Sequence, residues 1–254
     1  MAEEVSGQRS ERLGVGREQD ILEVIQSVQP DIAILQEVYT PDFLQDLGMA
    51  LNMEPFFANG NKKRRVALLS RLPICSASSH HPFFPIWRNV VEAEIEYQPN
   101  KILYVFGVHP KASLGIASEW QRRWEAKHIL KCVSPYLNRP CLIVGDFNAI
   151  APGDSIMTNT MPQWLKLILW LQGNRVYRFS IREYLAAGFT DSFRYLNDGE
   201  DGFTLPPPYP NSRLDYVFVN GVLKVHLKNC WVVREPVVVE KASDHYPVVA
   251  EFEL

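Results

Sequence analysis

The segment CLIVGDFN, residues 141–148, decides the fold class of this chain. Its first four residues are apolar, and the run is short enough to be a strand buried on both faces. Two polar side chains, Asp146 and Asn148, follow directly. An unpaired carboxylate beside a buried strand carries a large desolvation cost. The sequence therefore predicts that Asp146 has a partner at the end of this strand.

The same pattern recurs at other predicted strands. In each case an acid or a histidine stands where a short apolar run begins or ends, which is where side chains from neighbouring strands meet. These residues are Glu37 after 32–35, His109 after 104–108, Asp215 at the start of 214–219, and Asp244 and His245 before 248–253.

Each of these residues also has an ordinary structural explanation. A glutamate at a strand end is usually solvated, and the GDFN motif (residues 145–148) is also the pattern of a plain Asx-turn. The Asp-His pair at 244–245 suits a cap with a surface imidazole. Asp215 suits an ion pair with Arg213, and His109 suits a satisfied, partly buried histidine. One shared site explains all of them together better than five independent coincidences do.

Several carboxylates at one sheet edge would repel one another, and a divalent cation removes that penalty. The donors are carboxylate and amide oxygens, which select a hard ion such as Mg²⁺ or Mn²⁺ over zinc. The four cysteines show no Cys-x-x-Cys spacing, so they predict neither a zinc site nor a disulfide framework.

Helical and strand periods alternate along the chain, and no linker-like break divides it. Ser118 and Gln121 have the spacing of a capping box at the start of a helix. Helices are predicted over residues 21–28 and 118–133, helical and loop-rich chain over 152–187, and strands over 32–35, 66–69, 91–97, 102–108, 141–144, 214–219, 222–232 and 248–253. This order predicts one α/β sandwich domain over residues 17–254, preceded by a polar tail over residues 1–16.

The composition is that of an ordinary globular protein. The chain has 254 residues, of which 46% are hydrophobic and 22% charged, which excludes disorder, collagen and coiled coil. Its longest nearly continuous apolar stretch, residues 164–171, is far shorter than the roughly 20 residues that cross a bilayer. No signal peptide opens the chain, and the cysteine usage fits a reducing compartment. We therefore expect a cytoplasmic monomer without a transmembrane segment.

The net charge of −3 argues against a protein that coats nucleic acid, but the charge is unevenly spread. No Asp or Glu occurs from Pro55 to Val91, a window that we call the basic island. Its cations are Lys62, Lys63, Arg64, Arg65, Arg71 and Arg88. Such an island on an acidic protein suggests an anionic ligand. A solvated loop that lacks acids explains it equally well.

Taken in order, these motifs resemble the endonuclease/exonuclease/phosphatase superfamily, which includes DNase I, abasic-site endonucleases, neutral sphingomyelinases and inositol-polyphosphate 5-phosphatases. The resemblance rests on Leu35-Gln36-Glu37, His109, Gly145-Asp146-Phe147-Asn148, Arg213-Leu214-Asp215-Tyr216 and Ser243-Asp244-His245. It runs from about residue 17 to the C-terminus. It implies a four-layer α/β sandwich with two central mixed sheets and a Mg²⁺-dependent phosphoesterase.

The resemblance also implies a role for each acid and amide. Glu37 would be the principal metal ligand, and Asp244 would contribute to the same metal site. Asp146 would orient or deprotonate the attacking water, and Asn148 would hold the water or the phosphate. These roles fit phosphoryl chemistry, which needs positioning and charge neutralisation more than covalent catalysis.

Two histidines would contact the scissile phosphate under the same resemblance. His245 would carry a proton or stabilise charge, with Asp215 fixing its tautomer. His109 would be the second phosphate-contacting histidine, although Pro110 follows it where the family usually has an aliphatic residue.

The family normally begins with a strand that ends in a metal-associated asparagine. Residues 1–16 contain neither an apolar strand nor an asparagine. We therefore expect the fold to lack its usual N-terminal strand. This leaves two hypotheses: an active phosphodiesterase, nuclease or phosphatase, and a catalytically impaired member that binds a phosphorylated ligand or partner.

The substrate clues are thinner. Arg64 and Arg65 in the basic island are candidates for substrate contacts, and nucleic acid, phospholipid and inositol phosphate all remain open as substrates. The apolar segment 164–171 reads either as a buried helix or as an apolar rim for a lipid head group or a partner.

Overall fold

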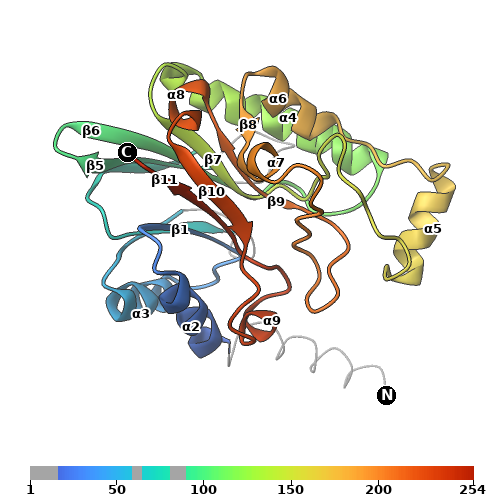
Figure 1. The fold of residues 1–254 in the computed structure, drawn as a ribbon, viewed down its shortest axis with the longest axis horizontal. Helices are drawn as coiled ribbons and strands as arrows, with labels where there is room; N and C mark the ends of the chain where they lie inside the picture. The colour runs from blue at the N-terminus through green and yellow to red at the C-terminus, as the bar shows by residue number, and fades with distance from the viewer. Residues whose placement is uncertain (1–16, 59–64, 81–89) are drawn as a thin grey trace.

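The computed structural model of the chain describes residues 17–58, 65–80 and 90–254 (Figure 1). Eight of the eleven strands in these residues overlap the predicted runs, whereas the strands over 54–57, 74–80 and 190–191 were not predicted. The strands are β1 Ile32–Gln36, β2 Glu54–Phe57, β3 Val66–Ser70, β4 Ile74–His80, β5 Val90–Gln98, β6 Lys101–Val108, β7 Cys141–Asp146, β8 Thr190–Asp191, β9 Asp215–Val219, β10 Leu227–Val232 and β11 Val248–Phe252.

The helices connect and cover these strands. The long ones follow segments with apolar residues at helical spacing, and the short ones lie in connections between strands. The helices are α2 Glu18–Val28, α3 Pro41–Leu51, α4 Ile116–Val133, a 3₁₀ turn η2 Ser134–Tyr136, α5 Gln163–Leu171, α6 Phe179–Ala186, α7 Ser192–Leu196, α8 Gly221–Lys224 and α9 Val239–Ala242. Within the described ranges no helix is both long and apolar enough to span a bilayer.

The largest sheet has six strands in the order β4-β5-β6-β7-β9-β8. It is mixed, because β6 and β7 run parallel through the α4 crossover while the other neighbours are antiparallel. Helices α4 and α6 cover one face of this sheet (Figure 1). The core on that face consists of aromatic and aliphatic side chains, including Phe106, Ile143 and Phe218 from the strands and Ile129 and Ile181 from the helices.

The other face of the six-stranded sheet packs against a second layer of strands. This layer consists of two antiparallel pieces, β1-β3-β2 and β10-β11. Val66 and Leu68 of β3 and the alternate residues Val248, Ala250 and Phe252 of β11 face the core between the layers. The outer side of this second layer is covered by α2, α3 and α9.

The four-layer α/β sandwich is therefore confirmed. The second central layer differs from the predicted mixed sheet, because in the described residues it consists of separate antiparallel pieces with β1 and β11 each at an edge. The predicted absence of the N-terminal strand concerns residues 1–16, which lie outside the described residues.

Two local predictions were wrong for identifiable reasons. Helix α4 begins two residues before Ser118, because Gly115, with φ of 139°, provides the turn into the helix and no side chain caps it. The predicted strand over 222–232 is interrupted, because the side chain of Asn220 accepts a hydrogen bond from Leu223 N and opens the short helix α8.

Candidate active site

The site lies where β7 ends and β9 begins. The two strands are antiparallel neighbours, and Asp146 at the end of β7 is the direct pairing partner of Asp215 at the start of β9. Both carboxylates therefore project from adjacent strands at one edge of the six-stranded sheet. The backbone pairing alone brings together two acids that are far apart in the sequence.

Gly145 permits the close approach of β6 and β7 at this edge. Its φ is 147°, and a Cβ at this position would lie 2.0 Å from the carbonyl oxygen of Val108. Only glycine fits here, because the backbone conformation and the space both exclude a side chain. Gly145 thus fixes the position from which Asp146 extends.

Asn148 holds the carboxylate of Asp146 in place. Its backbone N–H donates to Oδ1 at 2.7 Å, and its side-chain amide donates to Oδ2 at 2.8 Å and to the carbonyl of Pro110 at 3.3 Å. Asn148 has a φ of 50°, in the left-handed region that asparagine tolerates. The Asx-turn explanation is therefore correct, and the same turn positions the acid at the site.

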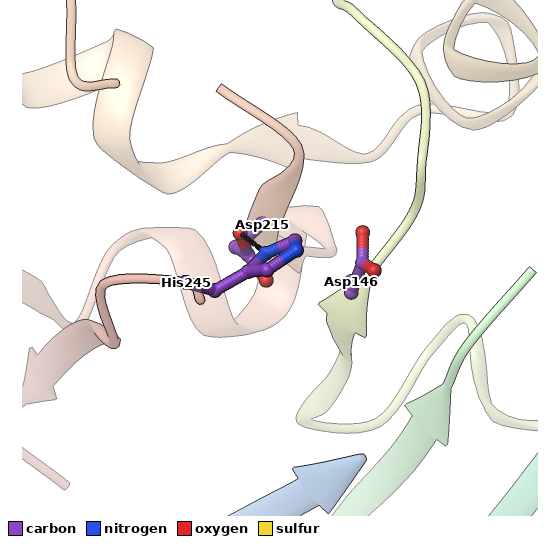
Figure 2. Close-up of side chains that lie close together, drawn as sticks. All are labelled: Asp146, Asp215 and His245. Atoms are coloured by element: carbon purple, nitrogen blue, oxygen red, sulfur yellow. Dashed lines mark hydrogen bonds and ion pairs between the residues drawn. The ribbon is translucent and has the colours of Figure 1, made fainter. Parts of the chain in front are cut away.

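His245 is oriented by Asp215. Its Nδ1 lies 2.8 Å from Asp215 Oδ2, and its backbone N–H donates to Ser243 Oγ at 3.1 Å. Figure 2 shows the imidazole extending from Asp215 toward Asp146. Burial lowers the pKa of His245, but the charge of Asp215 and the hydrogen bond to it raise it to about 10. The imidazole is therefore protonated at neutral pH.

The two carboxylates differ in their electrostatics. Burial opposes ionisation of Asp146, but the hydrogen bond from His109 and the charge of His245 outweigh burial and lower its pKa. Burial raises the pKa of Asp215, and the nearby charge of Asp146 raises it further. Asp146 is thus the more readily ionised of the two, and its charge repels that of Asp215.

His109 lies inside the protein beside Asp146. It follows β6, it is buried, and its Nε2 lies 3.5 Å from Asp146 Oδ2. The parallel pairing of Val108 with Gly145 accounts for this proximity, because the next residue of each chain, His109 and Asp146, then lies at the same end of the sheet. The structure therefore brings four of the predicted residues together around Asp146: Asn148, His109, Asp215 and His245.

The predicted metal ligands Glu37 and Asp244 are both exposed, and Glu37 follows β1 with a φ of 58°. Burial raises the pKa of the Tyr39 hydroxyl, and the charges of Glu37 and Asp244 raise it further, so both acids lie within electrostatic range of this residue. Among the described residues, the His/Cys/Asp/Glu group with ligand atoms all within 4.8 Å of one another consists of Asp146, Asp215 and His245.

The predicted substrate contacts in the basic island are less well defined. Arg64 lies outside the described residues. The guanidinium of Arg65 lies 4.7 Å from the centre of the Phe57 ring, and the backbone carbonyl of Arg65 accepts from Val38 N at 3.3 Å. Because Val38 directly follows Glu37, this hydrogen bond places the backbone of Arg65 next to the end of β1.

The sequence did not indicate the residues that support Asp215. Thr204 hydrogen-bonds the Asp215 side chain, and its Oγ1 accepts from Leu214 N at 3.1 Å. Arg213 does not pair with Asp215 as the alternative explanation assumed. It forms two hydrogen bonds with Asp191, at 2.8 and 2.6 Å, and one with Asp154, at 2.9 Å. No local pattern marks these partners, because they come from parts of the chain that are distant in the sequence, Asp191 from the end of β8 and Asp154 from the chain after β7.

Comparisons with known proteins agree with the motif order. A sequence model described as the Endonuclease/Exonuclease/phosphatase family matches residues 5–245. No curated protein sequence matches the chain.

Similar solved structures include an AP endonuclease from Archaeoglobus fulgidus, which is 18% identical, with 93% of this chain and 94% of that chain covered and a TM-score of 0.74. The 3' phosphatase NExo from Neisseria, bound to a product DNA hairpin, is 20% identical, with 94% and 95% covered and a TM-score of 0.72. A truncated Caenorhabditis elegans TDP2 is 16% identical, with 92% and 90% covered and a TM-score of 0.63. At these identities the likeness shows a shared fold.

Proposed function

The chain belongs to the endonuclease/exonuclease/phosphatase family, and on this premise we propose that it hydrolyses phosphate esters at the edge formed by Asp146, Asp215 and His245. The observation that carries the proposal is the pairing of His245 with Asp215 beside an ionised Asp146. The protonated imidazole provides a positive charge, and the ionised carboxylate beside it provides a proton acceptor.

Asp146 is the proposed acceptor of the proton of the attacking water, because its lowered pKa keeps the carboxylate ionised and Asn148 fixes its position. His245 is the proposed contact to the phosphate, because its Nδ1 is held by Asp215 and the opposite edge of its ring faces the site. His109, buried against Asp146, assists at the same phosphate.

A divalent cation fits the donors at this edge. The carboxylates of Glu37, Asp244 and Asp146 would hold Mg²⁺ or Mn²⁺, whose chemistry when bound is to neutralise phosphate charge. His245 is the less suitable ligand, because a ligating imidazole must be neutral and the pKa of His245 is raised to about 10. The repulsion between Asp146 and Asp215 supports a cation at this edge.

The test is hydrolysis of bis(p-nitrophenyl) phosphate with Mg²⁺ or Mn²⁺. We expect the variants Asp146→Asn and His245→Gln each to lower kcat by roughly 10²–10⁴-fold, the usual contribution of a positioned acid or base. The matched control is Asp46→Asn, an exposed acid on α3, which should retain full activity. If the wild type is as inert as both variants, the catalytically impaired member is the correct hypothesis. If all are equally active, the site assignment is wrong.

Metal binding has its own readout. Mn²⁺ should raise the melting temperature of the wild type, because it binds the folded site and not the unfolded chain. The rise should disappear in Asp146→Asn and shrink in Glu37→Gln and Asp244→Asn. An unchanged rise in the latter two would remove Glu37 and Asp244 from the proposed metal site.

The salt dependence of binding distinguishes the candidate substrate classes. A nucleic-acid substrate predicts that binding falls steeply as salt rises, because phosphate contacts release counterions. A small inositol phosphate, which carries no comparable counterion atmosphere, predicts a shallower dependence. Fluorescence anisotropy with labelled duplex DNA, with inositol phosphate as competitor, compares the two directly.

A further inference from the structure

Helix α5 carries an apolar surface that the described parts of the chain leave uncovered. Trp164 is 61% exposed, Leu167 56%, Trp170 66% and Leu171 68%, whereas Leu169 is the buried residue of the helix. Of the two interpretations of this segment, the buried helix is therefore wrong and the apolar rim agrees with the structure. In Figure 1, α5 lies at the periphery, away from both layers of strands.

The exposed side chains of α5 share one side of the helix. Positions 164, 167 and 171 are spaced by three and four residues, the spacing that places side chains above one another on a helix, and residue 170 adjoins them. Gln172 anchors the C-terminal end of α5, because its side-chain oxygen accepts a hydrogen bond from Ile116 N at the start of α4. The apolar side is thus presented on an attached helix.

The start of α4 adds a second exposed apolar stripe where α5 ends. Ile116, Trp120 and Trp124 recur every four residues and are all exposed. The two acids of α4, Glu119 and Glu125, are both buried. The ring of Trp120 contacts that of Phe179, which in turn contacts Tyr177. Tyr177 and Phe179 lie on the chain that leaves α5, so this aromatic cluster connects the chain after α5 to α4.

The chain segment that carries α5 has a positive charge. The segment from Ser155 to Arg182 contains no Asp or Glu and four cations. Arg178 is used internally, since it donates to the backbone carbonyls of Ala151 and Asp154. Arg175 and Arg182 are exposed. The segment therefore combines exposed apolar side chains with two exposed arginines and contains no acid.

We propose that α5 is an interfacial helix that binds the protein to an anionic phospholipid surface. Exposed tryptophan and leucine, followed along the chain by exposed arginine, is a pattern of helices that lie in the headgroup region, with the apolar side toward the acyl chains and the arginines at the phosphates. The surface charge complements an anionic bilayer and would repel a second copy of itself. The tryptophans suit base stacking as well as a bilayer interface, but Leu167 and Leu171 offer no ring for stacking, and this favours hydrocarbon over nucleic acid.

Vesicle co-sedimentation tests this proposal without reference to catalysis. The wild type should bind vesicles of phosphatidylcholine and phosphatidylserine and bind pure phosphatidylcholine vesicles more weakly. Leu167→Ser combined with Trp170→Ser should lower the partition coefficient by about tenfold or more, because two apolar side chains no longer leave water. Arg175→Gln combined with Arg182→Gln should remove the preference for the anionic lipid.

The matched control is Met49→Ser combined with Val225→Ser, two exposed apolar residues on α3 and after α8, which should bind as the wild type does. The melting temperature and the ester hydrolysis of each variant should match those of the wild type. A loss of vesicle binding is then a defect in lipid binding and is not caused by misfolding or by a damaged active site. Equal vesicle binding by the wild type and the α5 variant, or no binding by either, overturns the proposal.

A second measurement locates the helix in the bilayer. Lipids brominated on the acyl chains quench tryptophans that reach the hydrocarbon. The variant Trp164→Phe, Trp170→Phe keeps the apolar side, so it should bind vesicles normally while losing the part of the quenching that comes from α5. Quenching in this variant equal to that of the wild type places only tryptophans outside α5 in the lipid and overturns the role of α5. A wild type that dimerises through α5, or binds DNA through it, and ignores vesicles overturns the proposal as well.

Discussion

Arg213 and Asp215 stand two positions apart, yet the fold gives them separate partners. Arg213 is fully buried, with Asp191 and Asp154 around its guanidinium, and this leaves Asp215 to hold His245. A buried guanidinium is tolerated only when its donors are satisfied. Asp191 and Asp154 therefore support the proposed active site through Arg213.

We expect Asp191→Ala to destabilise the protein by about 3–5 kcal/mol, the usual cost of removing one partner of a buried ion pair. The change leaves Arg213 with Asp154 alone and removes the acceptor for Arg194 N that begins α7. Urea unfolding followed by circular dichroism measures the loss. Asp191→Asn keeps an oxygen at the same place and should lose less.

The control for that prediction is the surface pair Lys228–Glu253, whose atoms lie 2.5 Å apart in solvent. Glu253→Gln should leave the urea midpoint unchanged, because exposed pairs contribute little. A midpoint for Asp191→Ala equal to that of the wild type would contradict the importance of the buried network.

Some residues of the candidate site can be predicted from the sequence, and others cannot. Asp146, Asn148, Asp215 and His245 were identified because each adjoins an apolar run and their order matches a family. Thr204 and Asp191 were not, because their function comes from contacts with distant chain and their neighbours in the sequence carry no pattern. Partner choice, as for Arg213, depends on which loops pack together.

At the level of elements, the β6–α4–β7 unit determines the geometry of the site. The strands were predictable from their apolar runs, since burial on both faces leaves a simple signal. The beginning of α4 was not, because a glycine turn at Gly115 replaces a side-chain cap. The exposure of α5 was not predictable either, because an apolar helix looks the same in sequence whether or not another element covers it.

Gly145→Ala should disrupt the end of this unit. The new Cβ would collide with the carbonyl of Val108, and the backbone is already in a region that alanine avoids. We expect a loss of stability of ~1–3 kcal/mol from overpacking and ~1–3 kcal/mol from backbone strain, with loss of ester hydrolysis as Asp146 moves. Gly153→Ala, at a positive φ but with open space around it, should show only the strain and keep activity. Similar losses in the two variants would mean that the close approach of β6 and β7 is unimportant.

At the level of the whole molecule, the four cysteines differ in burial according to the layer in which they lie. Cys75 is exposed on β4, Cys132 is partly buried on α4, and Cys141 and Cys230 are buried in strands of the two central layers. Burial raises the pKa of Cys141 and of Cys230 to about 12, and it also raises the pKa of Cys132. The buried thiols are therefore protonated and unreactive at neutral pH.

We expect a disulfide reagent at pH 8 to modify Cys75 rapidly and Cys132 slowly. Cys141 and Cys230 should react only in denaturant, because the layers must separate before the thiols ionise. Counting thiols with Ellman's reagent in native and denatured protein measures this, and Cys75→Ser should remove the fast phase. Rapid reaction of all four native thiols would contradict the four-layer packing.

The direct pairing of Asp146 with Asp215 has a consequence for the chain between them. Residues 147–214, which include α5 and the short strand β8, form an excursion from the end of β7 that closes at the start of β9. The register of β7 and β9 sets the spacing of the two carboxylates, and residues near the two ends of the excursion, such as Asn148 and Thr204, hold them. The outer part of the excursion, which carries α5, can therefore differ in length or sequence and change what surrounds the proposed site without changing the spacing of its two acids.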